Sequence, residues 1–68
     1  MVDGVVPDIQ VGRVTDGPLE TRISVRGGNI VMQYVKGARG WEVVYSVKSA
    51  TLLLDVLMQA IGTASGRG

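Results

Sequence analysis

The chain has 68 residues, 46% of them hydrophobic, and a formal net charge of +1. It contains no cysteine and no histidine, which excludes disulfides, thiolate and imidazole metal sites, and catalysis by Ser-His-Asp or Cys-His groups. The composition is typical of one small folded domain. Because so short a domain removes only about 60% of its unfolded surface from water, we expect it to gain stability by self-association.

The order of residues predicts a single cytoplasmic domain. Uninterrupted apolar runs are at most three residues long, which argues against a membrane span. Met1 to Gly4 lack the charged start and the apolar stretch of a signal peptide. We assign residues 9–62 to the domain, residues 1–8 to an N-terminal extension and residues 63–68 to a flexible tail.

The first half of the domain is predicted to be antiparallel strands. Residues 9–15 form the first strand, which ends in a turn at residues 16–18; Pro7 marks its start and fits either a strand beginning or a sheet edge. Residues 21–26 alternate between apolar and polar side chains, and residues 29–35 form the returning strand after Gly27-Gly28, the pattern of a tight hairpin. The register that gathers the apolar side chains on one face pairs Arg26 with Asn29, Val25 with Ile30, Ile23 with Met32, and Thr21 with Tyr34.

Another strand is predicted over residues 41–47, after a four-residue loop at residues 37–40. A five-residue loop that began at Lys36 would turn Glu42 and Ser46 toward the apolar face, so the four-residue loop is preferred. The preferred loop pairs Tyr34 with Val43, Met32 with Tyr45, and Ile30 with Val47.

The hydrophobic period then changes and predicts a helix over residues 50–61. Ser49 is its expected N-cap, and Gly62 is placed to end it. Only a narrow stripe of this helix is polar, formed by Thr51, Asp55 and Gln59.

The apolar side of this helix covers an arc of about 240°, against roughly 100° or somewhat more for a helix that lies on a single core. A sheet covers one side of a helix, and a large contiguous apolar patch is unusual on a monomer. The predicted structure is therefore a two-layer α+β homodimer, in which a sheet of three to four antiparallel strands is covered by one C-terminal helix. The residues expected in the dimer interface are Leu52, Leu54, Met58 and Ile61.

No group of residues predicts catalysis. The six carboxylates are dispersed and do not converge as a metal or acid–base site requires. No phosphate-binding glycine motif occurs. We therefore expect no enzyme activity, no catalytic residues, no metal and no cofactor. Asp55 is expected on the exposed stripe of the helix or in an interface salt bridge.

The basic residues are the best indication of a binding function. Arg22 and Arg26 share a strand face, and Arg13 can join them from the first strand, which would give a basic strip suited to a phosphate backbone. A solvated sheet face is the alternative. The residues expected to contact nucleic acid are Arg13, Arg22, Arg26, Gln33, Lys36 and Arg39. The three aromatic residues, Tyr34, Trp41 and Tyr45, are predicted in the core under the helix rather than as stacking surfaces for bases.

Several segments resemble a known family. Residues 9–14, Ile23-Ser24-Val25-Arg26 and residues 28–34 are similar to the first three strands of the single-stranded-DNA-binding domain of the transcriptional coactivator positive cofactor four. The resemblance covers residues 9–61. It implies a homodimer that holds single-stranded DNA or melted duplex on the sheet face away from the helices, with Arg13, Arg22 and Arg26 as backbone contacts.

A second resemblance belongs to another class of protein. Residues 28–32 and the leucine-rich helix also look like the small dimerisation subunit of the KEOPS tRNA-modification complex, which bridges larger proteins. The sequence thus predicts a non-enzymatic dimeric protein that holds single-stranded DNA or RNA. The alternative is an assembly subunit of a larger protein complex.

Overall fold

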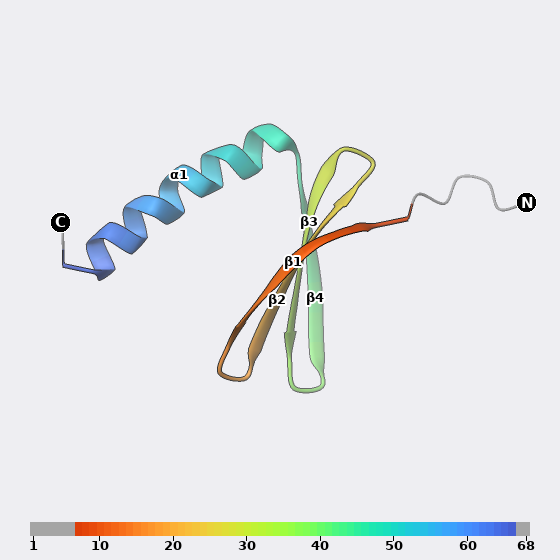
Figure 1. Cartoon of the computed structure of the whole chain (residues 1–68), viewed down its shortest axis with the longest axis horizontal. Coiled ribbons are helices and arrows are strands. Elements are labelled where there is room, and N and C mark those ends of the chain that lie inside the picture. The colour runs from red at the N-terminus through yellow and green to blue at the C-terminus, as the bar shows by residue number, and fades with distance from the viewer. Residues whose placement is uncertain (1–6, 67–68) are drawn as a thin grey trace, which may run out of the picture.

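The computed structural model describes residues 7–66 and contains one four-stranded antiparallel sheet followed by one helix (Figure 1). The strands lie in the order β1-β2-β3-β4, so each strand pairs with the next along the chain. The predicted α+β class is confirmed. Residues 1–6 of the expected extension and residues 67–68 of the expected tail lie outside the described residues. The elements are β1 (Ile9–Asp16), β2 (Leu19–Arg26), β3 (Asn29–Lys36), β4 (Arg39–Tyr45) and α1 (Val47–Ala64).

Each of the three hairpins closes through two residues. Gly27 and Gly28 have φ angles of 57° and 81°, and two successive positive φ angles are typical of a type I′ turn. In the other two hairpins only the first turn residue is positive, Gly17 at 58° and Gly37 at 61°, which is typical of a type II′ turn. These turns match the twist of the strands and set their register.

The predicted register of the β2–β3 hairpin is confirmed. Its four expected pairs are Arg26 with Asn29, Val25 with Ile30, Ile23 with Met32, and Thr21 with Tyr34. The register follows from the two-residue turn, because a slip of one residue would move every apolar side chain to the opposite face.

The predicted register of β3 and β4 is wrong by two residues. Tyr34 pairs with Trp41 instead of Val43, and Met32 and Ile30 are shifted in the same way, pairing with Val43 and Tyr45. The connection is Gly37-Ala38, and Gly40 lies within β4, where it pairs with Val35. Because the shift is an even number of residues, the same side chains still face the same side of the sheet.

Both predicted ends of the helix are also wrong. Ser46 is the N-cap: its backbone is extended, and its Oγ accepts a hydrogen bond of 3.1 Å from the backbone N–H of Ser49. The helix continues through Gly62 to Ala64, so the first part of the expected tail is helical. Gly66, with φ of 75°, follows the C-cap and has the conformation that was expected at Gly62.

β1 is an edge strand, one of the two places that Pro7 fits, and it carries a bulge. The register shifts between Gln10 and Gly12, which leaves Val11 as the extra residue. Gln10 donates from Nε2 to the carbonyl oxygen of Gly12 at 3.1 Å and accepts a long hydrogen bond of 3.4 Å from Ser24 Oγ. The bulge therefore interrupts pairing along this edge of the sheet.

The alternation of side chains gives the sheet two different faces. The apolar face consists of Val14, Thr21, Ile23, Val25, Ile30, Met32, Tyr34, Trp41, Val43 and Tyr45. The polar face consists of Gln10, Arg13, Glu20, Arg22, Ser24, Arg26, Gln33 and Glu42, with Val31, Val35 and Val44 among them. The two fully buried side chains, Val31 and Ser24, are cross-strand partners on the polar face.

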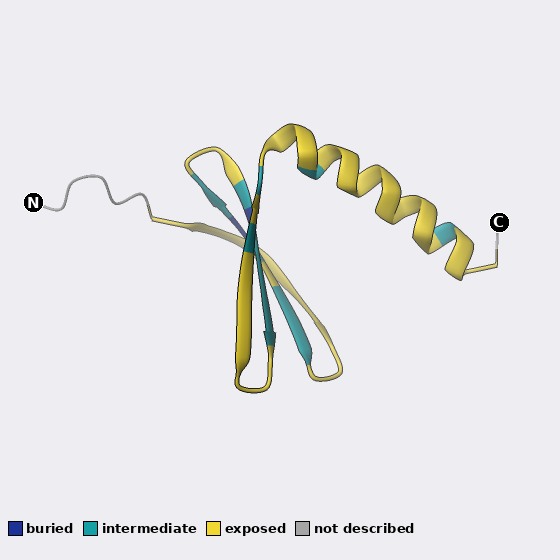
Figure 2. Cartoon of the chain, turned by 180° about the vertical axis from the view of Figure 1, so that it is seen from behind, coloured by how far each residue is buried: buried dark blue, intermediate teal, exposed yellow. Residues whose placement is uncertain are grey.

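The helix covers much less of the sheet than a two-layer arrangement requires. α1 approaches β3 and β4 near its beginning and then extends away from the sheet (Figure 1). None of its residues is buried, and it is exposed over most of its length (Figure 2). The expectation that the sheet would shelter one side of this helix is therefore met only at its first turns.

Candidate functional site

The polar face brings together four of the six residues predicted to contact nucleic acid. Arg13, Arg22 and Gln33 lie opposite one another on β1, β2 and β3, in a row that ends at Glu42 on β4. Arg26 lies on the same face of β2, nearer the Gly27-Gly28 turn. A continuous cross-strand row of this kind requires the β-strand period of two, which the sequence has.

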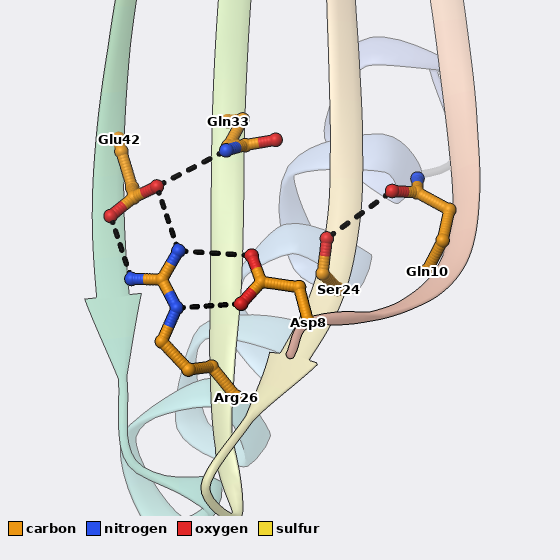
Figure 3. A network of polar contacts seen from close by, with 6 residues as sticks. All are labelled: Asp8, Gln10, Ser24, Arg26, Gln33 and Glu42. Atoms are coloured by element: carbon orange, nitrogen blue, oxygen red, sulfur yellow. Dashed lines mark hydrogen bonds and ion pairs between the residues drawn. The ribbon is translucent and has the colours of Figure 1, made fainter. Parts of the chain in front are cut away.

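Arg26 is held between two carboxylates (Figure 3). Its Nε and Nη2 donate to the two carboxylate oxygens of Asp8 at 2.7 and 2.9 Å, and its Nη1 and Nη2 donate to Glu42 at 3.0 and 3.2 Å. Glu42 also accepts a hydrogen bond of 3.1 Å from Gln33 Nε2. The Arg26 hydrogen bonds lower the pKa of both carboxyl groups, and the two carboxylates raise the pKa of Arg26.

The other two arginines of the polar face share one carboxylate. Glu20 forms a hydrogen-bonded ion pair with Arg22, its near neighbour on β2, and lies 4.0 Å from Arg13 Nη1. The hydrogen bond from Arg22 lowers the pKa of Glu20. The three arginines of this face are therefore matched by three carboxylates, those of Asp8, Glu20 and Glu42. The face is polar and close to neutral, rather than a basic strip.

Two shallow hollows flank Arg22. One, of about 420 Å³, is lined by Gln10, Gly12, Arg13 and Arg22 beside the β1 bulge. The other, of about 310 Å³, is lined by residues of β2, β3 and β4 that include Arg22, Gln33 and Gly40. Both are open to solvent, and neither is enclosed as a small-molecule pocket usually is.

Lys36 and Arg39 do not belong to the polar face. They are cross-strand partners next to the Gly37-Ala38 turn, and their register positions place them at the end of the apolar face. The reason is parity, because Gln33 and Lys36 are three residues apart on one strand and so point to opposite sides. Among residues 7–66, the ion pairs found involve Arg13, Arg22 and Arg26, and neither Lys36 nor Arg39 takes part in one.

The aromatic residues beside these cations are more exposed than predicted. Tyr34 and Trp41 are cross-strand partners on the apolar face. Each lies two residues along its strand from Lys36 or Arg39, and so on the same face as these cations. Their rings stack, with centroids 5.5 Å apart and an angle of 22° between the planes. Trp41 is 50% exposed. The expectation that these rings would be buried under the helix is wrong, because α1 crosses the other end of this face.

The four residues predicted in a dimer interface lie on α1, and all are exposed by more than half: Leu52, Leu54, Met58 and Ile61. An apolar hollow of about 190 Å³ separates the first half of α1 from the sheet. Its lining consists of Ile23, Ile30, Met32, Ala50, Leu53, Leu54 and Leu57.

α1 is also long and apolar enough to cross a membrane, with a mean hydropathy of 1.2 over its 18 residues. The count of uninterrupted apolar runs did not detect this, because single polar residues interrupt the helix. One such helix is a weak indication of a membrane span. It also carries Asp55 near its middle, and a charge at that depth is costly in a bilayer.

No cluster of metal-ligating side chains occurs within residues 7–66. Comparison of the chain with protein families, with curated proteins and with solved structures finds no match. The resemblances to positive cofactor four and to the small KEOPS subunit therefore stay predictions.

Proposed function

We propose that this protein is not an enzyme and that it holds single-stranded nucleic acid at the Gly37-Ala38 end of its sheet. The Tyr34–Trp41 stack would be the surface on which bases lie, and Lys36 and Arg39 would contact the phosphate backbone. Binding of single strands without sequence preference combines these two features, exposed aromatic rings and nearby cations. The observation that carries the proposal is an aromatic stack in which Trp41 is 50% exposed, beside two cations outside the observed ion pairs.

The polar face is the less favoured contact surface for phosphates. Its arginines already neutralise carboxylates of the same face, so a phosphate would have to compete with Asp8, Glu20 and Glu42. Arg13 and Arg22 remain candidate contacts at the margin of the site, because each lines a solvent-open hollow. Arg26 is assigned to holding the sheet and the start of β1 together.

The test uses the single tryptophan of the chain as a reporter. Titration of labelled oligothymidine, followed by anisotropy and by Trp41 fluorescence, should show binding that weakens with salt and an emission change on stacking. Stacking contributes roughly 1–3 kcal/mol per base, so Trp41→Leu should weaken binding about tenfold. Lys36→Gln combined with Arg39→Gln should reduce the slope of log affinity against log salt by roughly 1.4, since single strands release about 0.7 counterion per phosphate contact.

Arg13→Gln combined with Arg22→Gln is the matched control, because it also removes two exposed positive charges from the sheet. The proposal requires this pair to have the smaller effect. If instead it abolishes binding and the Lys36 and Arg39 variants do not, the polar face is the contact surface. Absence of binding at low salt would contradict a nucleic-acid function on either face.

Protein assembly is the second candidate function. It is favoured by the exposed apolar surface of α1, which a larger protein could cover. Capture of a defined partner complex together with absence of oligonucleotide binding at low salt would put this candidate first.

A further inference from the structure

The chain has more surface than a compact monomer of its size. Its accessible surface is 5489 Å², whereas a compact monomer of this mass has about 4,100 Å². The radius of gyration is 14.6 Å, against about 11 Å for a compact domain of this length. The excess of about 1,400 Å² exceeds the roughly 800 Å² that each partner buries in a standard protein interface.

Two exposed apolar surfaces stand out on the molecule. One is the second half of α1, from Val56 to Ala64, which carries no charged residue and in which Met58 and Ile61 are 63% and 57% exposed. The other is the part of the apolar face beyond the reach of α1, where Val14 is 61% exposed. Each surface could bury the other, but within one chain they lie apart (Figure 1).

The short connection between sheet and helix sets the direction in which α1 leaves the sheet. β4 ends at Tyr45, Ser46 is the helix cap, and α1 begins at Val47, so a single residue separates strand from helix. Ser46 also caps the helix by accepting a hydrogen bond from the backbone N–H of Ser49. α1 is about 27 Å long and leaves the sheet in one direction, so its second half lies beyond its own sheet (Figure 1).

We infer that the occupant of this space is a second copy of the chain, and that the second half of each α1 packs on the uncovered apolar face of the other copy. The arrangement is reciprocal, as a two-fold interface requires. It places the neighbouring helix beside the apolar hollow that α1 forms with Ile23, Ile30 and Met32. The helix of the second copy covers the part of the face next to α1, around Val43, and leaves the Tyr34–Trp41 stack at the Gly37-Ala38 end open. This inference does not depend on nucleic-acid binding.

The absence of cysteine in the chain allows a direct test by crosslinking. An Ile61→Cys chain is mixed with a Val43→Cys chain and oxidised, and the disulfide between the two kinds of chain is measured by mass spectrometry. Val44→Cys replaces Val43→Cys in the control, because Val44 is the adjacent residue on the polar face and is 47% exposed. The inference requires at least a fivefold excess of mixed disulfide with Val43→Cys. Equal yields, or a higher yield with Val44→Cys, would overturn it.

A second measurement compares the oligomeric state of two variants of α1. Met58→Glu should convert the dimer to a monomer in light scattering after size exclusion, whereas Gln59→Glu, which adds the same charge to the polar stripe, should leave it a dimer. A wild-type protein that is monomeric at tens of micromolar would overturn the inference. The inference would also be overturned if the protein were monomeric in buffer and co-floated with phosphatidylcholine vesicles in a density gradient. That result would show that a lipid bilayer covers the apolar surface.

Discussion

At the scale of single residues, the structure depends most on Arg26. This side chain reaches from β2 to Glu42 on β4 and to Asp8 before β1, and so links both edges of the sheet (Figure 3). Bidentate pairing between a guanidinium and a carboxylate fixes direction as well as distance. Arg26 therefore holds together parts of the chain that no turn connects.

The carboxylates that pair with arginine make the stability of the fold depend on pH. The pKa values of Asp8, Glu20 and Glu42 are lowered in the folded protein by hydrogen bonds from arginine. A carboxyl group whose pKa is lowered by folding stabilises the protein at pH values above its pKa in the unfolded chain, about 4. This stabilisation is lost as the pH falls through the pKa of the same group in the folded protein. We expect the melting temperature, followed by circular dichroism, to fall as the pH is lowered from 5 to 3.

Arg26→Gln should reduce this acid sensitivity and lower the melting temperature at pH 7. Arg39→Gln is the control, because Arg39 takes no part in the ion pairs observed within residues 7–66. Equal acid sensitivity in wild type and Arg26→Gln would show that the network does not stabilise the fold.

These ionic partners could not be read from the sequence. Asp8 and Glu42 are 18 and 16 residues away from Arg26, and Asp8 was assigned to the extension. The predicted β3–β4 register already placed Glu42 on the polar face but opposite Val35, and the correct turn places it opposite Gln33. By contrast, the alternation of side chains between the two sheet faces was enough to predict that Arg13, Arg22 and Gln33 share one face.

At the scale of elements, one misread turn accounts for several errors. Gly40 was taken as part of a four-residue loop, preferred because a five-residue loop would turn Glu42 toward the apolar face, yet a two-residue turn with positive φ at Gly37 suffices. The longer predicted loop shifted the fourth strand by two residues, so its predicted end was residue 47 instead of Tyr45. The first residue of α1 and its cap were therefore assigned to the strand. The same change explains why Ser46, and not Ser49, caps α1. The β2–β3 hairpin was predictable because its two turn glycines and the alternation of residues 21–26 both select one register.

The cap at Ser46 can be tested by substitution. Ser46→Ala removes the acceptor of the Ser49 backbone N–H, and loss of an N-cap costs about 1 kcal/mol. We expect a lower unfolding free energy in urea and unchanged secondary structure. Ser49→Ala, whose side chain is not the cap, should be close to neutral. The opposite order of effects would place the cap at Ser49.

At the scale of the whole molecule, the direction of α1 is the decisive feature. Periodicity predicted the helix and the width of its apolar arc, but no local pattern specifies the angle at which a helix leaves a strand. The arc exceeded what one sheet could cover, and the structure leaves even more of it exposed than that argument required. The exposure of Trp41 has the same origin, because a helix that leaves the sheet does not cover its far end.

Sedimentation equilibrium of the wild-type chain tests most directly whether this apolar surface is covered by a second copy. At low micromolar concentration and neutral pH, without lipid or nucleic acid, we expect a mass twice the 7.2 kDa of one chain. A single species of one-chain mass that remains folded across the same concentrations would contradict the account.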